Sequence, residues 1–200
     1  MIVTFFREVV EEYVRGVKGL QLRLLEHISE GLGLEREYLG GELSEGVALA
    51  VNHYPPSPNP DLTVGQPEHT DPTVITIAHG GNVSAFQIIK DGQWFTVETP
   101  PQGFLVFMGS QIEVISNGKL KALQHRAAST RETRYTAIFF INPSPECIVE
   151  PAKAILEAEN SSSLYKSYKY EDFYKAHVGP KPKGKGYFYD DVVEELANKS

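Results

Sequence analysis

The chain has 200 residues, of which 41% are hydrophobic and 22% are charged, so a disordered chain, a collagen and a coiled coil are excluded as descriptions. There are 19 Lys and Arg residues against 26 Asp and Glu residues, which gives a net charge of −7 and a pI near 5.4. A general basic surface for nucleic acid or an anionic membrane is therefore absent. We predict a small-molecule partner, no nucleic-acid partner and no membrane partner.

The cellular compartment of the protein is predicted from its cysteine content and from its first residues. The single cysteine, Cys147, cannot close a disulfide within the chain or form a Cys-rich metal site, which favours a reducing environment. The first 14 residues carry four charges and lack the apolar region of a signal peptide, and no apolar run exceeds five residues. We therefore expect a cytoplasmic protein.

An amphipathic helix is predicted near the start of the chain. From Phe6 to Ile28 the apolar residues recur at intervals of three and four, which is the spacing of one helical face. Gly31 and Gly33 then act as stop signals. We interpret residues 1–45 as an N-terminal helical support.

The next region, residues 46–142, is predicted to be rich in strands. Short β-prone runs alternate with turn sequences such as PPSPNPD, HGGN, KDG and SNG. The runs are VALAVNHY, TVITIAH, SAFQIIK, QWFTVE, GFLVFM, QIEVIS and YTAIFFI. Seven or eight short strands without long intervening helices favour a jelly roll, or double-stranded β-helix, over a parallel α/β sheet.

Helical character returns in the last region, residues 143–200. The sequences AKAILEAEN, YEDFYKAHV and DVVEELAN predict short helices, and KPKGKG is typical of a solvated connector. The predicted fold class is therefore mainly β with flanking α-helices, built around a double-stranded β-helix barrel.

A metal site is the first functional hypothesis. His69 and Asp71 lie two positions apart, and in an extended strand such residues project to the same face. With a second histidine they would form the two-His, one-carboxylate triad of non-haem Fe(II) oxygenases. His125 is the best candidate, because the other histidines lie in helical patterns, in a turn or on the opposite strand face; these are His27, His53, His79 and His177. The competing interpretation is a His–Asp hydrogen bond beside a turn.

A second pair of residues indicates an anion site. Arg134 and Thr136 open the most apolar strand, RYTAIFFIN, and share a face with Ile138 and Phe140. A guanidinium there is costly unless it meets an anion, and a dicarboxylate would fit it. Pairing with a protein glutamate, or an Arg that reaches out to solvent, is the alternative.

A third pair shows the same spacing. Asn52 and Tyr54 present an amide and a phenol on one face of the run VALAVNHY, directly before the proline-rich stop PPSPNP. We include both residues among the candidate site residues.

Taken in order, five segments resemble the plant Fe(II)/2-oxoglutarate-dependent dioxygenases. These segments are NHYPPSPNPDL, EHTDPTVITI, FQIIKDGQW, GSQIEVISNGKLKALQHRA and RYTAIFF, and the resemblance covers roughly Phe5 to Val178. It implies a double-stranded β-helix that oxidises a small plant hormone or specialised metabolite. Hydroxylation or desaturation would be accompanied by release of succinate and CO2.

The resemblance also implies a role for each candidate. His69, Asp71 and His125 would be the Fe(II) ligands, Arg134 and Thr136 would meet the distal carboxylate of 2-oxoglutarate, and Asn52 and Tyr54 would lie close to that co-substrate. O2 would be the oxidant and ascorbate a reductant, and no catalytic residue beyond the metal centre is implied. Apolar side chains are expected to line the substrate space: Val74, Ile75, Phe104, Phe107, Ile138 and Phe140.

Departures from the family pattern keep two alternatives open. Thr136 replaces the usual Ser, Ser57 a Cys, His53 a Tyr and Ser110 an Asp. Family members also begin further upstream, so one alternative is a barrel that binds metal or a ligand with impaired or uncoupled turnover. Another is a relative of the ascorbate-using aminocyclopropane-carboxylate oxidases. A requirement for 2-oxoglutarate would separate this second alternative from the dioxygenase hypothesis.

Overall fold

A computed structural model describes residues 2–180 and 188–197. The chain divides into two compact units, Met1–Gly41 and Glu42–Ser200, and each is described by itself. Among the described residues, no helix combines the length and the apolarity needed to cross a membrane.

The first unit is built on one long helix, α1 (Ile2–Gly31), which confirms the predicted helix and its end. The amide of Gly33 donates to the carbonyl of Glu30 at 3.0 Å, and Gly33 has a φ of 74°, which a residue with a side chain adopts at a cost. Beyond the turn, the Arg36 guanidinium pairs with Glu26 at 2.7 Å and with Glu30 at 3.0 Å. Because all three side chains are substantially exposed, these pairs add little stability.

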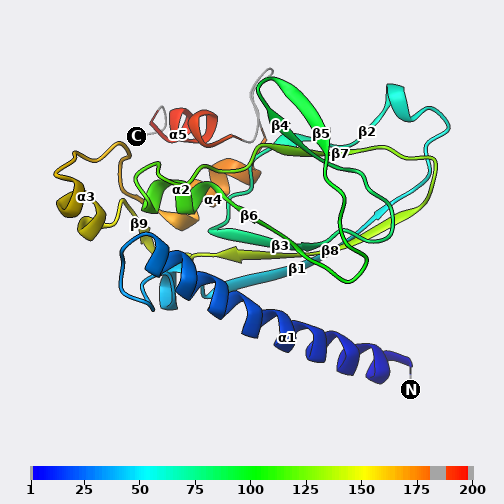
Figure 1. Cartoon of the computed structure of the whole chain (residues 1–200), viewed down its shortest axis with the longest axis horizontal. Coiled ribbons are helices and arrows are strands. Elements are labelled where there is room, and N and C mark those ends of the chain that lie inside the picture. Colours follow the sequence, from blue (N-terminus) through cyan, green and yellow to red (C-terminus); the bar gives the residue numbers. More distant parts are fainter. Residues whose placement is uncertain (1, 181–187, 198–200) are drawn as a thin grey trace. The chain divides into compact units, whose positions relative to one another are not determined.

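The second unit contains two four-stranded antiparallel sheets, in the orders β1-β8-β3-β6 and β2-β7-β4-β5 (Figure 1). This arrangement confirms the predicted double-stranded β-helix. The strands are β1 (Gly46–Tyr54), β2 (Val64–His69), β3 (Ile75–His79), β4 (Phe86–Lys90), β5 (Gln93–Thr96), β6 (Leu105–Met108), β7 (His125–Ala128) and β8 (Arg134–Asn142).

Smaller elements complete the second unit. A two-stranded sheet joins β9 (Ile148–Val149) to β10 (Tyr168–Lys169). The remaining elements are the α-helices α2 (Ser110–Ile115), α3 (Lys153–Glu159), α4 (Tyr170–Val178) and α5 (Tyr189–Ala197), and the 3-10 helices Gly41–Leu43 and Pro60–Leu62.

The core of the second unit follows from strand alternation. On β8, Phe139 and Ile141 are fully buried on one face, while Arg134 and Thr136 are buried on the other. Ile75 and Ile77 of β3 are also fully buried, and β3 lies between β8 and β6. Burial of apolar side chains on such central strands stabilises the sheet that carries the polar candidates.

The prediction of a strand at QIEVIS was wrong, because this segment forms α2. The amides of Ser110 and Gln111 donate to the carbonyls of Asp71 and Thr73, at 2.8 and 2.9 Å. The first amides of a helix have no partner within the helix, and these bonds satisfy two of them. The acceptors, in the segment Asp71–Thr73, are distant from the helix in sequence. Tertiary context therefore overrides the β propensity of Ile112, Val114 and Ile115, all of which are buried.

Two strands were not predicted. β2 contains Pro67 and is exposed along most of its length, so it lacks apolar alternation; it is an edge strand, where proline is tolerated. β7 has only four residues and pairs on both sides, with β2 and β4. These two strands carry the two predicted metal-ligating histidines.

The predicted C-terminal helices are confirmed as α3, α4 and α5. The KPKGKG connector at 181–186 lies outside the described residues. The three predicted regions, 1–45, 46–142 and 143–200, stay predictions.

Candidate functional site

A cavity of about 190 Å³ lies between the two four-stranded sheets. Its walls combine polar and apolar side chains, and all seven predicted site residues contribute to them. The lining residues are Ala50, Asn52, Tyr54, Gln66, His69, Asp71, Ala78, Gly80, Phe86, Leu105, Phe107, His125, Arg126, Ala127, Arg134, Thr136, Ile138 and Phe140.

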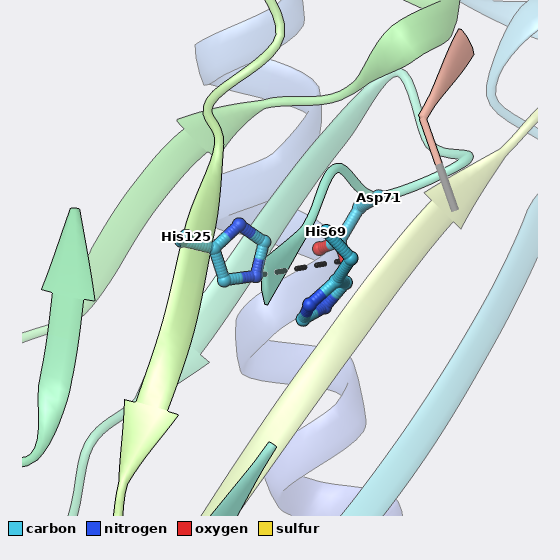
Figure 2. A group of neighbouring side chains, drawn as sticks. All are labelled: His69, Asp71 and His125. Atoms are coloured by element: carbon cyan, nitrogen blue, oxygen red, sulfur yellow. Dashed lines mark ion pairs between the residues drawn. The ribbon is translucent and has the colours of Figure 1, made fainter. Parts of the chain in front are cut away.

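Two histidines and an aspartate of the cavity wall lie close together (Figure 2). His69 and His125 are register partners in the β2–β7 pair, so their rings lie side by side with centroids 4.3 Å apart. Asp71 Oδ1 lies 3.4 Å from His69 Nε2 and 3.7 Å from His125 Nε2. Among the described residues, this is the one group of three whose ligand atoms all lie within 4.8 Å of one another.

Each histidine is oriented by a backbone carbonyl. His69 Nδ1 donates to Pro67 O at 2.8 Å, and His125 Nδ1 donates to Leu123 O at 2.9 Å, because a carbonyl can only accept. Each ring therefore carries a proton on Nδ1, and in its neutral form the Nε2 lone pair is available to a metal ion, whereas only a protonated His69 can also donate from Nε2 to Asp71. The neutral form with its proton on Nδ1 is the usual tautomer of a metal-binding histidine.

Asp71 does not lie in a strand, contrary to the prediction from its spacing. β2 ends at His69, and Asp71 lies two residues beyond it, in the turn that leads to β3. Its carboxylate is directed by Thr76 Oγ1, which donates to Asp71 Oδ2 at 2.6 Å, and its carbonyl accepts from the Ser110 amide. The hydrogen bonds from Thr76 and Ser110 thus hold Asp71 beside the histidines. Thr76 has no sequence signal that would single it out, because its contact with Asp71 depends on the fold.

The local electrostatics favour the ionised form of Asp71 and the neutral form of His125. Burial alone would raise the pKa of Asp71, but the His69 hydrogen bond, the charge of His125 and the Thr76 hydroxyl together lower it. Burial lowers the pKa of His125 more than the charge of Asp71 raises it, and the charge of His69 lowers it further. For His69, burial also lowers the pKa, but its hydrogen bond and attraction to Asp71 outweigh burial and raise it.

Arg134 and Thr136 form the second polar part of the cavity. Arg134 is only 4% exposed; its Nε donates to Gly80 O at 3.1 Å, and its guanidinium carbon lies 5.1 Å from the centre of the Tyr54 ring. Burial lowers the pKa of Arg134, an effect that Tyr54 partly offsets, but a guanidinium stays charged at neutral pH. Among the described residues, no carboxylate forms an ion pair with it.

Thr136 has a buried hydroxyl for which the described residues provide no hydrogen-bond partner. Register in the β1–β8 pair places Asn52 opposite Thr136 and Tyr54 opposite Arg134. The two pairs predicted from separate segments therefore lie together. A buried guanidinium without a counter-ion, next to an unpartnered hydroxyl, fits the carboxylate of a small ligand.

Aromatic side chains pack on the site next to His125. The rings of Phe86 and Phe107 lie 5.1 and 4.8 Å from the His125 ring. Of the predicted substrate-lining residues, Phe107, Ile138 and Phe140 line the cavity, whereas the others do not; Val74 and Ile75 are fully buried core residues.

The remaining histidines are not members of this cluster. His53 stacks on Tyr135 at a centroid distance of 4.7 Å, and His79 meets the edge of Phe104 at 6.0 Å. His27 pairs with Glu30 in the first unit, and His177 stacks on Phe173 at 6.1 Å. None of the four belongs to the group of possible metal ligands among the described residues.

The family model for the 2OG-Fe(II) oxygenase superfamily matches residues 46–143, the segment that forms both four-stranded sheets. The chain belongs to this superfamily. The oxygenase domain thus coincides with the strands that carry the predicted ligands.

Plant proteins are among the relatives of this 2OG-Fe(II) oxygenase chain. Protein DMR6-LIKE OXYGENASE 1 of Arabidopsis thaliana is 41% identical over 171 residues, covering 84% of this chain and 49% of that protein. Flavanone 3-dioxygenase 2 of rice is 38% identical over 174 residues, covering 85% of this chain and 50% of that protein. The chain therefore spans about half the length of the curated relatives that it matches.

Solved structures show the same fold. The structure of JOX2 in complex with 2OG, Fe and JA has a TM-score of 0.83 and 31% identity, covering 94% of this chain and 56% of that one. A rice dioxygenase for auxin oxidation, with a TM-score of 0.77 and 20% identity, covers 86% of this chain and 58% of that one. At that identity, the second likeness supports the fold alone.

Proposed function

We propose that this chain carries the catalytic domain of an Fe(II)- and 2-oxoglutarate-dependent dioxygenase. The reaction would hydroxylate or desaturate a small plant hormone or specialised metabolite and release succinate and CO2. One observation carries the proposal: a cavity that is lined at once by a two-His, one-carboxylate cluster and by a buried guanidinium that has no carboxylate partner among the described residues.

The iron ligands in this proposal are His69, Asp71 and His125. Two imidazole nitrogens and one carboxylate oxygen match the donor set of non-haem Fe(II) enzymes, which leaves coordination positions open for the co-substrate and O2. Both Nε2 atoms and Asp71 Oδ1 already face one another. When bound, the iron would supply the oxidising chemistry, with ascorbate as a reductant.

The co-substrate site in this proposal is the Arg134 side of the cavity. Arg134 and the Thr136 hydroxyl would bind the distal carboxylate of 2-oxoglutarate, with Asn52 and Tyr54 beside it. The apolar walls would hold the substrate and exclude water. The relatives support a class of reaction rather than one substrate, because their names include a flavanone dioxygenase and a 2'-deoxymugineic-acid dioxygenase.

The experiment is an anaerobic Fe(II) titration of the wild type and of His125→Ala, followed by a succinate assay in air with 2-oxoglutarate. We expect His125→Ala to abolish or sharply weaken iron binding, and succinate to depend on iron and on 2-oxoglutarate. His27→Ala is the matched control, because its ring is exposed and does not belong to the group of possible metal ligands.

Two results would contradict the proposal. Wild-type iron affinity in His125→Ala would remove the ligand assignment. Iron binding without 2-oxoglutarate consumption across a panel of flavonoids and plant hormones would instead indicate a binding barrel.

A further inference from the structure

The two oxygens of the Asp71 carboxylate have different surroundings. Oδ1 faces the Nε2 atoms of His69 and His125 at 3.4 and 3.7 Å, while Oδ2 accepts a hydrogen bond of 2.6 Å from Thr76 Oγ1. Asp71 is 3% exposed and Thr76 is 0% exposed, so bulk water does not compete for this bond. The carboxylate is therefore held with one particular oxygen toward the histidines.

The direction of the hydrogen bonds around Thr76 is fixed by proton count. A hydroxyl has one proton, and an ionised carboxylate can only accept, so the Thr76 proton goes to Asp71. The contact of 3.0 Å between Thr76 Oγ1 and Thr73 Oγ1 must then be donated by Thr73. Thr73 is also 0% exposed, and the result is a buried chain from Thr73 through Thr76 to Asp71.

The position of Thr76 in the sheet suits it to fix the orientation of the Asp71 carboxylate. It lies in the central strand β3, which pairs with β8 and β6 and is flanked at this position by the fully buried Ile75 and Ile77. A donor on such a strand moves less than one in a loop. Asp71, by contrast, lies in the turn before β3, where its own backbone does not determine where the carboxylate points.

We propose that Thr76 is a positioning residue of the metal centre, whose hydroxyl occupies Asp71 Oδ2 so that Oδ1 alone faces the ion. This inference rests on the proposed function. A carboxylate can ligate through one oxygen or through both, and a second oxygen would take a position that the co-substrate or O2 requires. By holding Oδ2, Thr76 restricts the aspartate to one coordination position.

The test measures Co(II) binding to the full chain without 2-oxoglutarate, by calorimetry and by visible absorption. Thr76→Val keeps the side-chain shape but removes the donor, and we expect the Co(II) dissociation constant to rise by about 10- to 100-fold, with shifted absorption bands. Thr76→Ser keeps the donor, and its affinity and bands should stay close to those of the wild type. The 2-oxoglutarate dissociation constant at saturating Co(II) should also rise in Thr76→Val.

A matched control distinguishes a purely structural role of Thr76 from the proposed positioning role. Ser116 is another fully buried hydroxyl; it donates to Glu113 O and accepts from the Leu120 amide, and it does not line the cavity. Ser116→Ala should lower the melting temperature of the metal-free protein but leave Co(II) affinity and bands unchanged. If Thr76→Val does not fold, Thr76→Cys, whose thiol is a weaker donor, should bind Co(II) more weakly than Thr76→Ser.

The outcomes separate this inference from the proposed function. A folded Thr76→Val with wild-type Co(II) affinity and wild-type absorption bands would overturn the positioning role, as would equal affinities of the Cys and Ser variants. A wild type that binds no Co(II), or binding that His125→Ala leaves unchanged, would overturn the proposed function itself.

Discussion

At the scale of single residues, two oppositely charged side chains are buried in the cavity walls. Burying a charge costs several kcal/mol unless neighbours compensate for it. Asp71 has such neighbours in His69, His125 and Thr76. Arg134 has the Gly80 carbonyl and the Tyr54 ring as neighbours, but no carboxylate partner among the described residues. A dicarboxylate ligand would provide the negative charge that these neighbours lack.

Arg134 gives the first prediction at this scale. We expect Arg134→Ala to raise the 2-oxoglutarate dissociation constant by about 10- to 100-fold, because a charge-assisted bidentate pair contributes about 1.5 to 3 kcal/mol. Arg134→Lys should recover only part of the affinity, since an ammonium cannot form the same two parallel bonds. The charge-transfer band of the anaerobic Fe(II) complex reports the binding.

The control for this prediction is Arg131→Ala. Arg131 is an exposed arginine that donates to Pro58 O and does not line the cavity. Its loss changes the net charge by the same amount, so a general electrostatic effect would appear in both variants. If Arg134→Ala and Arg131→Ala titrated alike, the distal carboxylate would bind elsewhere.

At the scale of elements, tight turns fix the strands that carry the site. The β4–β5 hairpin turns through Asp91 and Gly92, with φ values of 51° and 74°, as a two-residue hairpin with both central φ values positive requires. Gly81, directly after the Gly80 carbonyl that binds Arg134, has the same φ of 74°. The two glycines differ in the room available for a side chain. A Cβ at Gly92 would meet nothing within 4 Å, whereas a Cβ at Gly81 would collide with the Tyr135 carbonyl.

This difference predicts unequal costs for the same substitution. Gly92→Ala should lower the free energy of unfolding by about 1 to 2 kcal/mol, the usual cost of a left-handed conformation for a residue with a Cβ. Gly81→Ala should lower it by more, because the β3 turn must also move away from β8. It should weaken 2-oxoglutarate binding as well, by displacing Gly80. Urea unfolding at neutral pH compares the two variants, and equal losses would contradict the steric argument.

At the scale of the whole molecule, a group of tyrosines connects the C-terminal elements to the barrel. The Tyr170 hydroxyl contacts Pro72 O at 3.1 Å and Asn142 Oδ1 at 2.8 Å, which links α4 to the turn that follows Asp71 and to the end of β8. Burial raises the pKa of Tyr170, and burial also raises the pKa of Tyr168 and Tyr189. In the folded state all three therefore hold their protons more tightly than in the unfolded chain.

These shifts predict alkaline destabilisation. A tyrosine whose pKa is raised by folding contributes stability that is fully present below its unfolded pKa of about 10 and is lost as the pH rises above that value. The melting temperature should therefore fall increasingly steeply above about pH 10. Tyr170→Phe should cost about 1 to 2 kcal/mol at neutral pH, because the donor shared between Pro72 O and Asn142 Oδ1 is lost, but its melting temperature should decline less steeply above about pH 10. Parallel pH profiles for the two proteins would refute the role of Tyr170.

The sequence by itself predicted which residues meet in the cavity and determined much of the fold class. Amphipathic spacing predicted α1, and β-prone runs between turn residues predicted most strands of the double-stranded β-helix. The spacing of His69 and Asp71, and of Arg134 and Thr136, selected these residues because chemistry of that kind depends on residue type and local periodicity. The ligand roles themselves stay predictions.

Only the tertiary structure decided how distant segments meet. The β1–β8 register places Tyr54 opposite Arg134, and the β2–β7 register places His69 opposite His125, and neither pairing follows from local spacing. The helix at QIEVIS and the Thr76 bond to Asp71 depend in the same way on partners far along the chain. Local propensity differs by about 1 kcal/mol between strand-forming and other residues. Burial and hydrogen bonding to remote groups outweigh that difference, and they exist only once the barrel has formed.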